Sequence, residues 1–320
     1  MPRTSDSTTS TEPLPSLRPP APWRIGLVLG IGILAGSTAA ILIRLAMAAS
    51  GSSGPGFSLV IAAGRLALSG LALTPLLLPL LRIPPPASAL RYAVAAGIML
   101  AFHFAGFITS LSYTSITAGV TLSSSSPVWI ALLSWLWLNE RLSPLRFFAL
   151  LVSLGGALVI GLSQSGSGAG THPLVGNMLA LAAAGAVSVY FLLGRQAQRH
   201  GLTAGQFTAL SCVTGALVLS PFPLLAGSSY TGHGVEVYLY ILLIALIPQL
   251  IGHTIYTWTM RWLAPTVVSL IMLAIPALSS VLGYLVFGEI PGGSTVLGAA
   301  VLLLGLALAT LSLANKRKGT

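Results

Sequence analysis

Acidic side chains are scarce in this sequence. Five Asp and Glu residues stand against fifteen Lys and Arg residues in a chain of 320, and charged residues make up 6% of the whole. Because soluble domains carry about 25% charged residues, this scarcity excludes a chain whose main solvent is water. The single cysteine, Cys212, excludes an intrachain disulfide and a metal site built from several cysteines.

Several functional motifs are also missing. The sequence contains no Gly-Lys-Ser/Thr nucleotide-binding loop and no cluster of residues with metal-ligand spacing, so we expect no cofactor, no bound metal and no ATP hydrolysis. No acid, base and nucleophile converge, and the chain is not expected to be an enzyme. The net charge of +10 is spread in ones and twos between apolar runs rather than gathered in a patch, which argues against a nucleic-acid partner.

Long apolar runs dominate what is present, and 55% of the residues are hydrophobic. About 20 mostly apolar residues span a bilayer as a helix. Ten runs of suitable length are separated by turn residues, and no sustained alternation suggests a β-barrel. The sequence therefore predicts an all-α membrane protein with ten transmembrane helices. The predicted spans are 25–46, 58–80, 91–111, 116–138, 146–163, 175–194, 204–226, 237–259, 264–287 and 294–314.

The basic residues predict the orientation. With the N-terminus in the cytoplasm, all of the fifteen Lys and Arg residues except Arg44 and Arg65 fall in cytoplasmic segments, and the outer loops contain none. This bias is typical of a multi-pass protein with both termini in the cytoplasm, here in the inner (plasma) membrane. Residues 1–22, rich in Ser, Thr and Pro, are expected to form a disordered cytoplasmic tail, and residues 315–320 a short basic one.

One segment occurs twice in the chain. PVWIALLSWLWLNE runs from Pro127 to Glu140, and PALSSVLGYLVFGE runs from Pro276 to Glu289, so the two copies are 149 residues apart. The same offset pairs Gly156 with Gly305. Because each half holds five spans, an odd number, the copies must enter the membrane in opposite directions. We therefore expect two inverted five-helix repeats, 23–164 and 174–314, with a substrate site between them near the membrane midplane.

The first copy carries a family resemblance. The stretches Tyr113–Val120, Ser126-Pro127-Val128 and Leu133–Pro144 resemble the signature of the EamA domain, the core of the drug/metabolite transporter superfamily. The resemblance extends over residues 25–314, and the second repeat matches less closely. It implies ten helices in two five-span repeats with both termini inside. It also implies transport of small molecules, since members of that family export amino acids and other metabolites and some handle nucleotide sugars.

Charged and titratable residues inside a membrane are costly, so each one is a hypothesis about function. Arg65 lies in the second predicted span, where its guanidinium could meet a substrate carboxylate or phosphate, or else bond backbone carbonyls as a packing residue. Arg44 lies near the outer end of the first span and is expected to reach the headgroups. His103, in the third span, and His253, in the eighth, are predicted to line the cavity, with a buried packing role as the alternative.

Pairs of serines, prolines, tyrosines and glutamates complete the set of predicted site residues. Ser123 and Ser126 precede Pro127 and could form a hydrogen-bonding wall, or simply allow close packing. Pro127 and Pro276 are expected to kink the fourth and ninth spans symmetrically and to act in gating.

Tyr190 and Tyr256 lie inside the interfacial belt and, with His103, could meet the substrate side chain. Glu140 and Glu289 are expected to be structural, each satisfying donors at the start of the next helix.

These features predict a transporter that moves small polar metabolites, amino acids first, outward by alternating access. Because no acidic residue lies at the membrane centre, facilitated diffusion or exchange is favoured over proton-driven pumping. The expected partners are the small-molecule substrate and the lipid bilayer, and the sequence leaves open whether the protein forms a homodimer. A lipid-handling flippase, a non-transporting membrane partner and an intramembrane enzyme stay as alternatives.

Overall fold

The chain is built of helices. The computed structural model describes residues 20–52, 54–138, 144–162, 171–260, 262–263, 268, 271–272 and 274–316. The first half contains α1 (Pro22–Ser37), α2 (Ala39–Ser50), α3 (Pro55–Leu73), η1 (Thr74–Leu77), α4 (Leu78–Arg82), α5 (Ala87–Tyr113), α6 (Ile116–Ser123), α7 (Ser126–Leu138) and α8 (Pro144–Leu162). The second half contains α9 (Pro173–Arg199), α10 (Ala204–Leu219), α11 (Phe222–Leu225), α12 (Val235–Ile244), η2 (Ala245–His253), α13 (Thr254–Thr259), α15 (Ala274–Phe287) and α16 (Gly293–Lys316).

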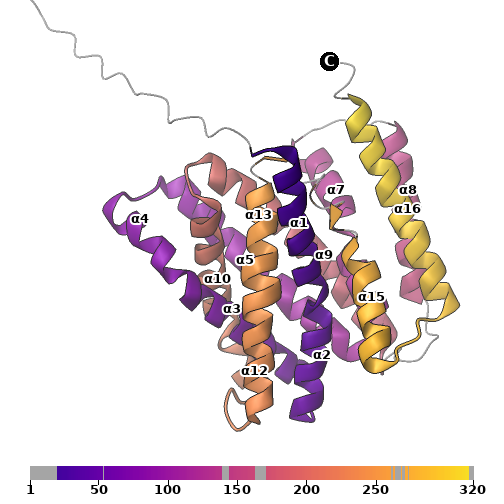
Figure 1. Ribbon diagram of the computed structural model, residues 1–320, viewed down its shortest axis with the longest axis horizontal. Helices are drawn as coiled ribbons and strands as arrows, with labels where there is room; N and C mark the ends of the chain where they lie inside the picture. The colour runs from indigo at the N-terminus through magenta and orange to yellow at the C-terminus, as the bar shows by residue number, and fades with distance from the viewer. Residues whose placement is uncertain are drawn as a thin grey trace, which may run out of the picture.

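The long helices run side by side as a bundle (Figure 1). Six helical stretches among the described residues are long and apolar enough to cross a membrane, namely Pro22–Ser50, Pro55–Arg82, Ala87–Tyr113, Pro173–Arg199, Ala204–Leu225 and Val235–Thr259. They coincide with the first, second, third, sixth, seventh and eighth predicted spans. The start of α1 and the end of α16 lie at the same end of the bundle, at the top of Figure 1.

The helix containing the serine run is broken rather than kinked. α6 ends at Ser123, and α7 begins at Ser126 with Pro127 in its first turn, where a missing N–H costs nothing. The carbonyl of Leu122 accepts from both the backbone N–H and the hydroxyl of Ser125, at 3.1 and 2.7 Å. In the second half, Pro276 likewise lies in the first turn of α15. Both prolines therefore begin helices, and the expectation of bent continuous spans gives way to a paired interruption.

A second irregularity lies between α12 and α13, which with η2 form one continuous rod (Figure 1). The intervening segment η2 is a π-helix that contains Pro248. Proline cannot donate the hydrogen bond that an α-helix needs at this position, and a locally wider turn accommodates it. The hydroxyl of Ser69 on α3 donates to the carbonyl of Ala245 at 3.2 Å, where η2 begins. This hydrogen bond thus holds the start of η2 against α3.

Glycines that are 149 positions apart bring related helices together. α8 and α16 lie side by side at one edge of the bundle (Figure 1). A Cβ on Gly156 would lie 2.4 Å from the backbone nitrogen of Leu302, and a Cβ on Gly305 would lie 2.5 Å from the hydroxyl of Ser153. Since 156 and 305 differ by 149, as do 153 and 302, the two contacts are reciprocal. The packing of α5 on α9 is likewise matched by that of η2 and α13 on α1.

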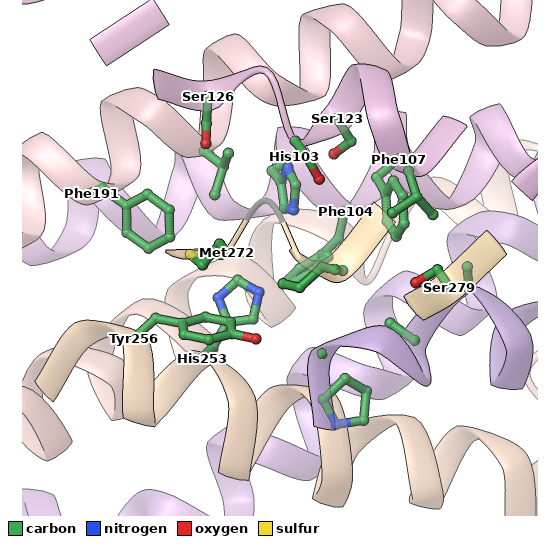
Figure 2. A pocket seen from close by; sticks show the side chains of 18 of the residues that line it. His103, Phe104, Phe107, Ser123, Ser126, Phe191, His253, Tyr256, Met272 and Ser279 are labelled. Carbon is green, nitrogen blue, oxygen red and sulfur yellow. The ribbon is translucent and has the colours of Figure 1, made fainter. Parts of the chain in front are cut away.

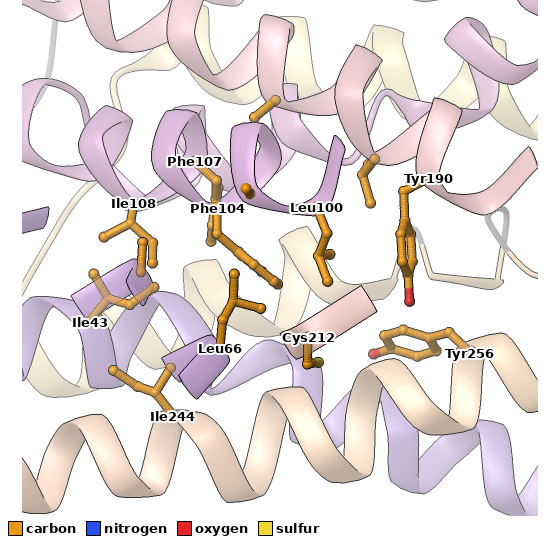
Figure 3. Close-up of a cluster of buried hydrophobic side chains, with 14 of the residues drawn as sticks. Ile43, Leu66, Leu100, Phe104, Phe107, Ile108, Tyr190, Cys212, Ile244 and Tyr256 are labelled. Atoms are coloured by element: carbon orange, nitrogen blue, oxygen red, sulfur yellow. The ribbon is translucent and has the colours of Figure 1, made fainter. Parts of the chain in front are cut away.

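The apolar core lies between α2, α3, α5, α9, α10 and the α12–α13 rod. Figure 3 shows its centre, where side chains from separate helices interdigitate. The largest fully buried apolar and aromatic side chains include Tyr190, Tyr256, Phe104, Phe191 and Phe207. Lipid is as apolar as these side chains, so shape and small residues at the contacts, rather than a gain in hydrophobic burial, hold the helices together.

The α8–α16 contact gives a direct test of packing. Gly156→Val places atoms where the backbone of Leu302 lies, and we expect a loss of about 1–3 kcal/mol in the free energy of unfolding, as for other overpacked sites. Gly155→Val is the matched control, because no atom lies within 4 Å of a Cβ at Gly155. Thermal unfolding in detergent measures both. Equal melting temperatures for the two variants would contradict the packing assignment.

Candidate functional site: a central cavity

A cavity of about 710 Å³, counting the part that is open to the outside, lies in the middle of the bundle (Figure 2). Helices from both halves of the chain form its wall. The lining residues are Gly36, Ala39, Ala40, Arg65, His103, Phe104, Phe107, Val120, Ser123, Ser124 and Ser126 from the first half, and Val187, Phe191, Pro248, His253, Tyr256, Met272, Ile275 and Ser279 from the second. Six of the predicted substrate-binding residues therefore share one cavity: Arg65, His103, Ser123, Ser126, His253 and Tyr256.

Arg65 is the charged group of this wall. Its side chain is 1% exposed, and its Nε donates to Oε1 of Gln249 at 2.9 Å. The guanidinium carbon lies 3.8 Å from the centre of the Phe104 ring, in a cation–π contact. Nη1 is buried without a hydrogen-bond partner among the described residues. The protein thus holds Nε and the face of the guanidinium, while Nη1 has no partner among the described residues.

The two histidines lie close to each other. The ring centroids of His103 and His253 are 6.3 Å apart, and the ring of Phe104 adjoins both (Figure 2). Nδ1 of His103 lies 2.9 Å from the carbonyl oxygen of Ala183 on α9. A carbonyl only accepts, so Nδ1 carries the proton, and in the neutral ring Nε2 is an acceptor. Nδ1 of His253 has no partner among the described residues.

The serine run supplies hydroxyls at the break between α6 and α7. Ser123 and Ser126 both line the cavity, together with Ser124 (Figure 2). The hydroxyl of Ser188 on α9 lies 3.0 Å from the carbonyl of Ser126 and 2.7 Å from that of Ala184, so it joins α9 to the start of α7. Polar irregular backbone is tolerated at this depth only where it is buried in protein or lines a cavity, and here it does both.

The two predicted tyrosines are placed differently. Tyr256 lines the cavity, and its hydroxyl donates to the carbonyl of Gly32 on α1. Tyr190 is buried but is not among the lining residues. Its ring packs against Phe191, Phe207 and His253 at centroid distances of 5.2, 5.2 and 6.3 Å. We therefore assign Tyr190 to the packing behind the wall, which corrects its predicted contact with substrate.

A polar network joins α2, α6 and the end of α15 at the bundle end opposite the two termini. Arg44 donates to the carbonyl of Thr114, and its Nη1 lies 3.9 Å from Oε2 of Glu289. Oε1 of Glu289 accepts from the backbone N–H of Thr117, in the first turn of α6, at 3.5 Å. We call Arg44, Thr114, Thr117 and Glu289 the Arg44–Glu289 network. Arg44 thus points into the protein, and the expectation that it reaches the headgroups is wrong.

The network also revises the role of Glu289. Its carboxylate contacts the start of a helix, but the helix is α6 of the other half rather than α16, the next along the chain. The lining residues Ala40 and Val120 lie one helical turn, about 5–6 Å, from Arg44 and Thr117. The network therefore bridges the two halves just beyond the cavity. Glu140, the repeat partner of Glu289, lies outside the described residues.

Several residues of the wall, and one residue that supports it, were not predicted from the sequence. Gln249, which holds Arg65, and Phe104, on which Arg65 stacks, were not predicted as site residues, nor were Ser279 and Met272. A signal for Gln249 was present, because Pro248-Gln249 interrupts an otherwise apolar predicted span. Phe104 carries no such signal, since an aromatic residue in a span is ordinary.

Comparison with known proteins identifies the class and the family. The fold is shared with a solved crystal structure, at a TM-score of 0.60 and 22% sequence identity, covering 91% of this chain and 98% of the other. The uncharacterised transporter YdfC of Bacillus subtilis (strain 168) is 25% identical over 222 residues, 68% of this chain and 71% of YdfC. The uncharacterised transporter YetK of the same organism is 31% identical over 121 residues, 38% of this chain and 36% of YetK.

These relatives and the apolar helices place the chain in the class of multi-pass membrane transporters, rather than enzymes. The model of the EamA-like transporter family matches residues 19–162 and again residues 174–311. The chain belongs to the EamA-like transporter family, as the sequence resemblance predicts.

Glu289 gives a pH test of the network. Burial raises the pKa of the Glu289 carboxyl, although Arg44 acts to lower that pKa. The folded protein therefore keeps the proton at a pH where the unfolded chain has lost it. The contribution of Glu289 to the free energy of unfolding is then greatest in acid and falls as pH rises through the raised pKa.

A comparison of wild type with Glu289→Gln isolates the contribution of the Glu289 carboxyl to the free energy of unfolding. We expect the melting temperature of wild type, relative to the variant, to fall as pH rises above the ordinary pKa of a glutamate, about 4. Glu236→Gln, at an exposed acid on α12, is the control and should show no such slope. A difference that rises with pH would mean that attraction to Arg44 outweighs burial, contrary to the assignment.

Proposed function

We propose that the protein moves small polar metabolites, amino acids first, outward across the membrane by alternating access through the central cavity. The observation that carries this proposal is the position of Arg65. Arg65 lines a cavity formed by both halves of the chain, and Nη1 of its guanidinium has no hydrogen-bond partner among the described residues. The guanidinium of an arginine can donate two parallel hydrogen bonds to one carboxylate. It is therefore suited to recognise the α-carboxylate that all amino acids share.

The proposed topology has ten spans in two inverted repeats, 23–164 and 174–314, with cytoplasmic tails at 1–22 and 315–320 in the inner membrane. The reciprocal contacts of Gly156 with Leu302 and of Gly305 with Ser153 support a two-fold relation between the halves. The start of α1 and the end of α16 lie at one end of the bundle (Figure 1), which supports an even number of spans. In such proteins the substrate binds where the repeats meet.

The cavity offers complementary groups for an amino acid. Arg65 would receive the carboxylate. Nε2 of His103, left as an acceptor by the bond from Nδ1 to Ala183, and the hydroxyls of Ser123 and Ser126 would receive the ammonium group. Phe107, Phe191 and Tyr256 would surround the side chain. This arrangement assigns His103 to the ammonium group rather than to the side chain.

The Arg44–Glu289 network would close one entrance. It joins α2 of the first repeat to the end of α15 of the second, so separation of the repeats at that end must break it. With the termini in the cytoplasm, this would be the outer end, and the network would close the described state to the outside. The break between α6 and α7 gives the first repeat a short helix pair that can move with such a change.

Transport without proton coupling is the expected mode. None of the lining residues is Asp or Glu, so the carboxylate relay that many proton-coupled transporters use is missing from this wall. Facilitated diffusion or exchange needs no such group.

Uptake into proteoliposomes tests the function. We expect selective uptake of part of a labelled mixture of amino acids and related metabolites, and we expect an imposed proton gradient to leave the accumulated amount unchanged. Accumulation driven by the gradient would contradict the uncoupled mode. Absence of any uptake by folded protein would overturn the proposal in favour of a lipid-handling or non-transporting role.

Arg65→Lys tests the carboxylate contact. Lysine keeps the charge but loses the planar fork, so uptake at low substrate concentration should fall by about tenfold or more, while the folded amount stays the same. Arg91→Lys, at an exposed arginine on α5, is the matched control and should transport as wild type does. Undiminished uptake by Arg65→Lys would remove Arg65 from substrate recognition.

A further inference from the structure

The guanidinium of Arg65 lacks an acidic partner within the described structure. The chain has five acidic residues. Asp6, Glu12 and Glu140 lie outside the described residues, Glu236 is exposed on α12, and Glu289 faces Arg44. None of the residues that line the cavity is acidic. A buried charge without a counter-charge is costly in an apolar surrounding, so the cavity as built favours the arrival of an anion.

An amide takes the place where a counter-ion would be expected. Gln249 is fully buried, and its Oε1 accepts from Nε of Arg65 at 2.9 Å. The orientation of the amide follows from chemistry, because a guanidinium only donates and the oxygen must face it. The Nε2 of Gln249 then points to Sγ of Cys212, which lies 3.4 Å away on α10. Gln249 thus fixes the guanidinium without neutralising it.

Two hydrogen bonds set the register between α3 and η2. Arg65 bonds Gln249, and Ser69, four residues further along α3, bonds the carbonyl of Ala245, four residues earlier in η2. The helices therefore run antiparallel and are fastened at two successive turns. The π-helical segment carries Gln249 and, at its end, His253, so one irregular element supplies both the holder of Arg65 and part of the wall.

We propose that Gln249 is the residue that determines the charge selectivity of the cavity. It positions Arg65 through Nε, leaves Nη1 without a partner among the described residues, and leaves the positive charge to be met by the ligand's own carboxylate. The inference rests on the proposed function, namely that this cavity holds the transported molecule. It adds that the substrate class is defined by a carboxylate, and that a neutral residue at position 249 is required for its recognition.

Gln249→Glu tests the proposal with almost no change in side-chain shape. The introduced carboxyl supplies the missing counter-ion, competes with the substrate for Arg65, and should lower the uptake of labelled amino acids at low concentration by about tenfold or more. Gln206→Glu is the matched control. Gln206 forms the capping box of α10 with Thr203, and a glutamate serves equally well there.

Two further readouts separate charge selectivity from a merely structural role. In wild type, amino acids should inhibit labelled uptake far better than the corresponding amino-acid amides, and Gln249→Glu should remove this preference. Lower pH, which protonates the introduced carboxyl, should partly restore uptake by the variant relative to wild type. A misfolded variant would show neither effect, and its melting temperature in detergent provides the check on folding.

The outcomes distinguish a failure of the inference from a failure of the proposed function on which it rests. If wild type takes up no carboxylate-bearing compound, the proposed function fails and the inference fails with it. If wild type transports and Gln249→Glu transports equally well, with the same preference for carboxylates over amides, the inference is overturned and the proposed function stands. Reduced uptake with a lost preference, restored in acid, supports both.

Discussion

The guanidinium of Arg65 is the group on which the arrangement of the cavity depends. Hydrocarbon offers a buried cation neither hydrogen bonds nor screening, so its partners must come from the protein or from a ligand. Phe104 supplies a ring face, Gln249 supplies one acceptor, and Nη1 is buried without a hydrogen-bond partner among the described residues. The π-helical turn that carries Gln249, the bond from Ser69 to Ala245 and the position of α3 all serve to hold this one side chain.

Packing between the halves determines where this site can form. Small residues let backbones approach closely, as at Gly156 and Gly305, and lipid provides no hydrophobic gain that could substitute for such contacts. At the interruption between α6 and α7, the hydroxyls of Ser125 and Ser188 meet the carbonyls of Leu122 and Ser126. At the far end, the Arg44–Glu289 network joins the halves by charge rather than by shape.

Sequence reasoning reached the family, the helical class and six of the cavity residues, because charged and polar side chains are conspicuous in apolar runs. It failed where residues distant in sequence determine the direction of a side chain. The direction of Arg44 depends on Thr114 and Glu289, which are far away in sequence, and snorkelling was the only local expectation. Tyr190 and Tyr256 look alike in their spans, yet the packing of Phe207 and Phe191 places only Tyr256 on the wall. Gln249 was not predicted because burying an uncharged amide in a span costs less free energy than burying a charge. Its neutrality is nevertheless the property that the proposed charge selectivity requires.

The most direct test of the account is the side from which the cavity can be reached. Ser123 lines the cavity and is half-buried, and Cys212 is the single native cysteine, so Ser123→Cys on a Cys212→Ser background gives one reporter thiol. A membrane-impermeant maleimide should label it only from the side that carries the chain termini, and added substrate should make it reactive from the opposite side as well. Labelling from the Arg44–Glu289 side without substrate, or from neither side under any condition, would contradict a cavity that opens alternately to the two faces.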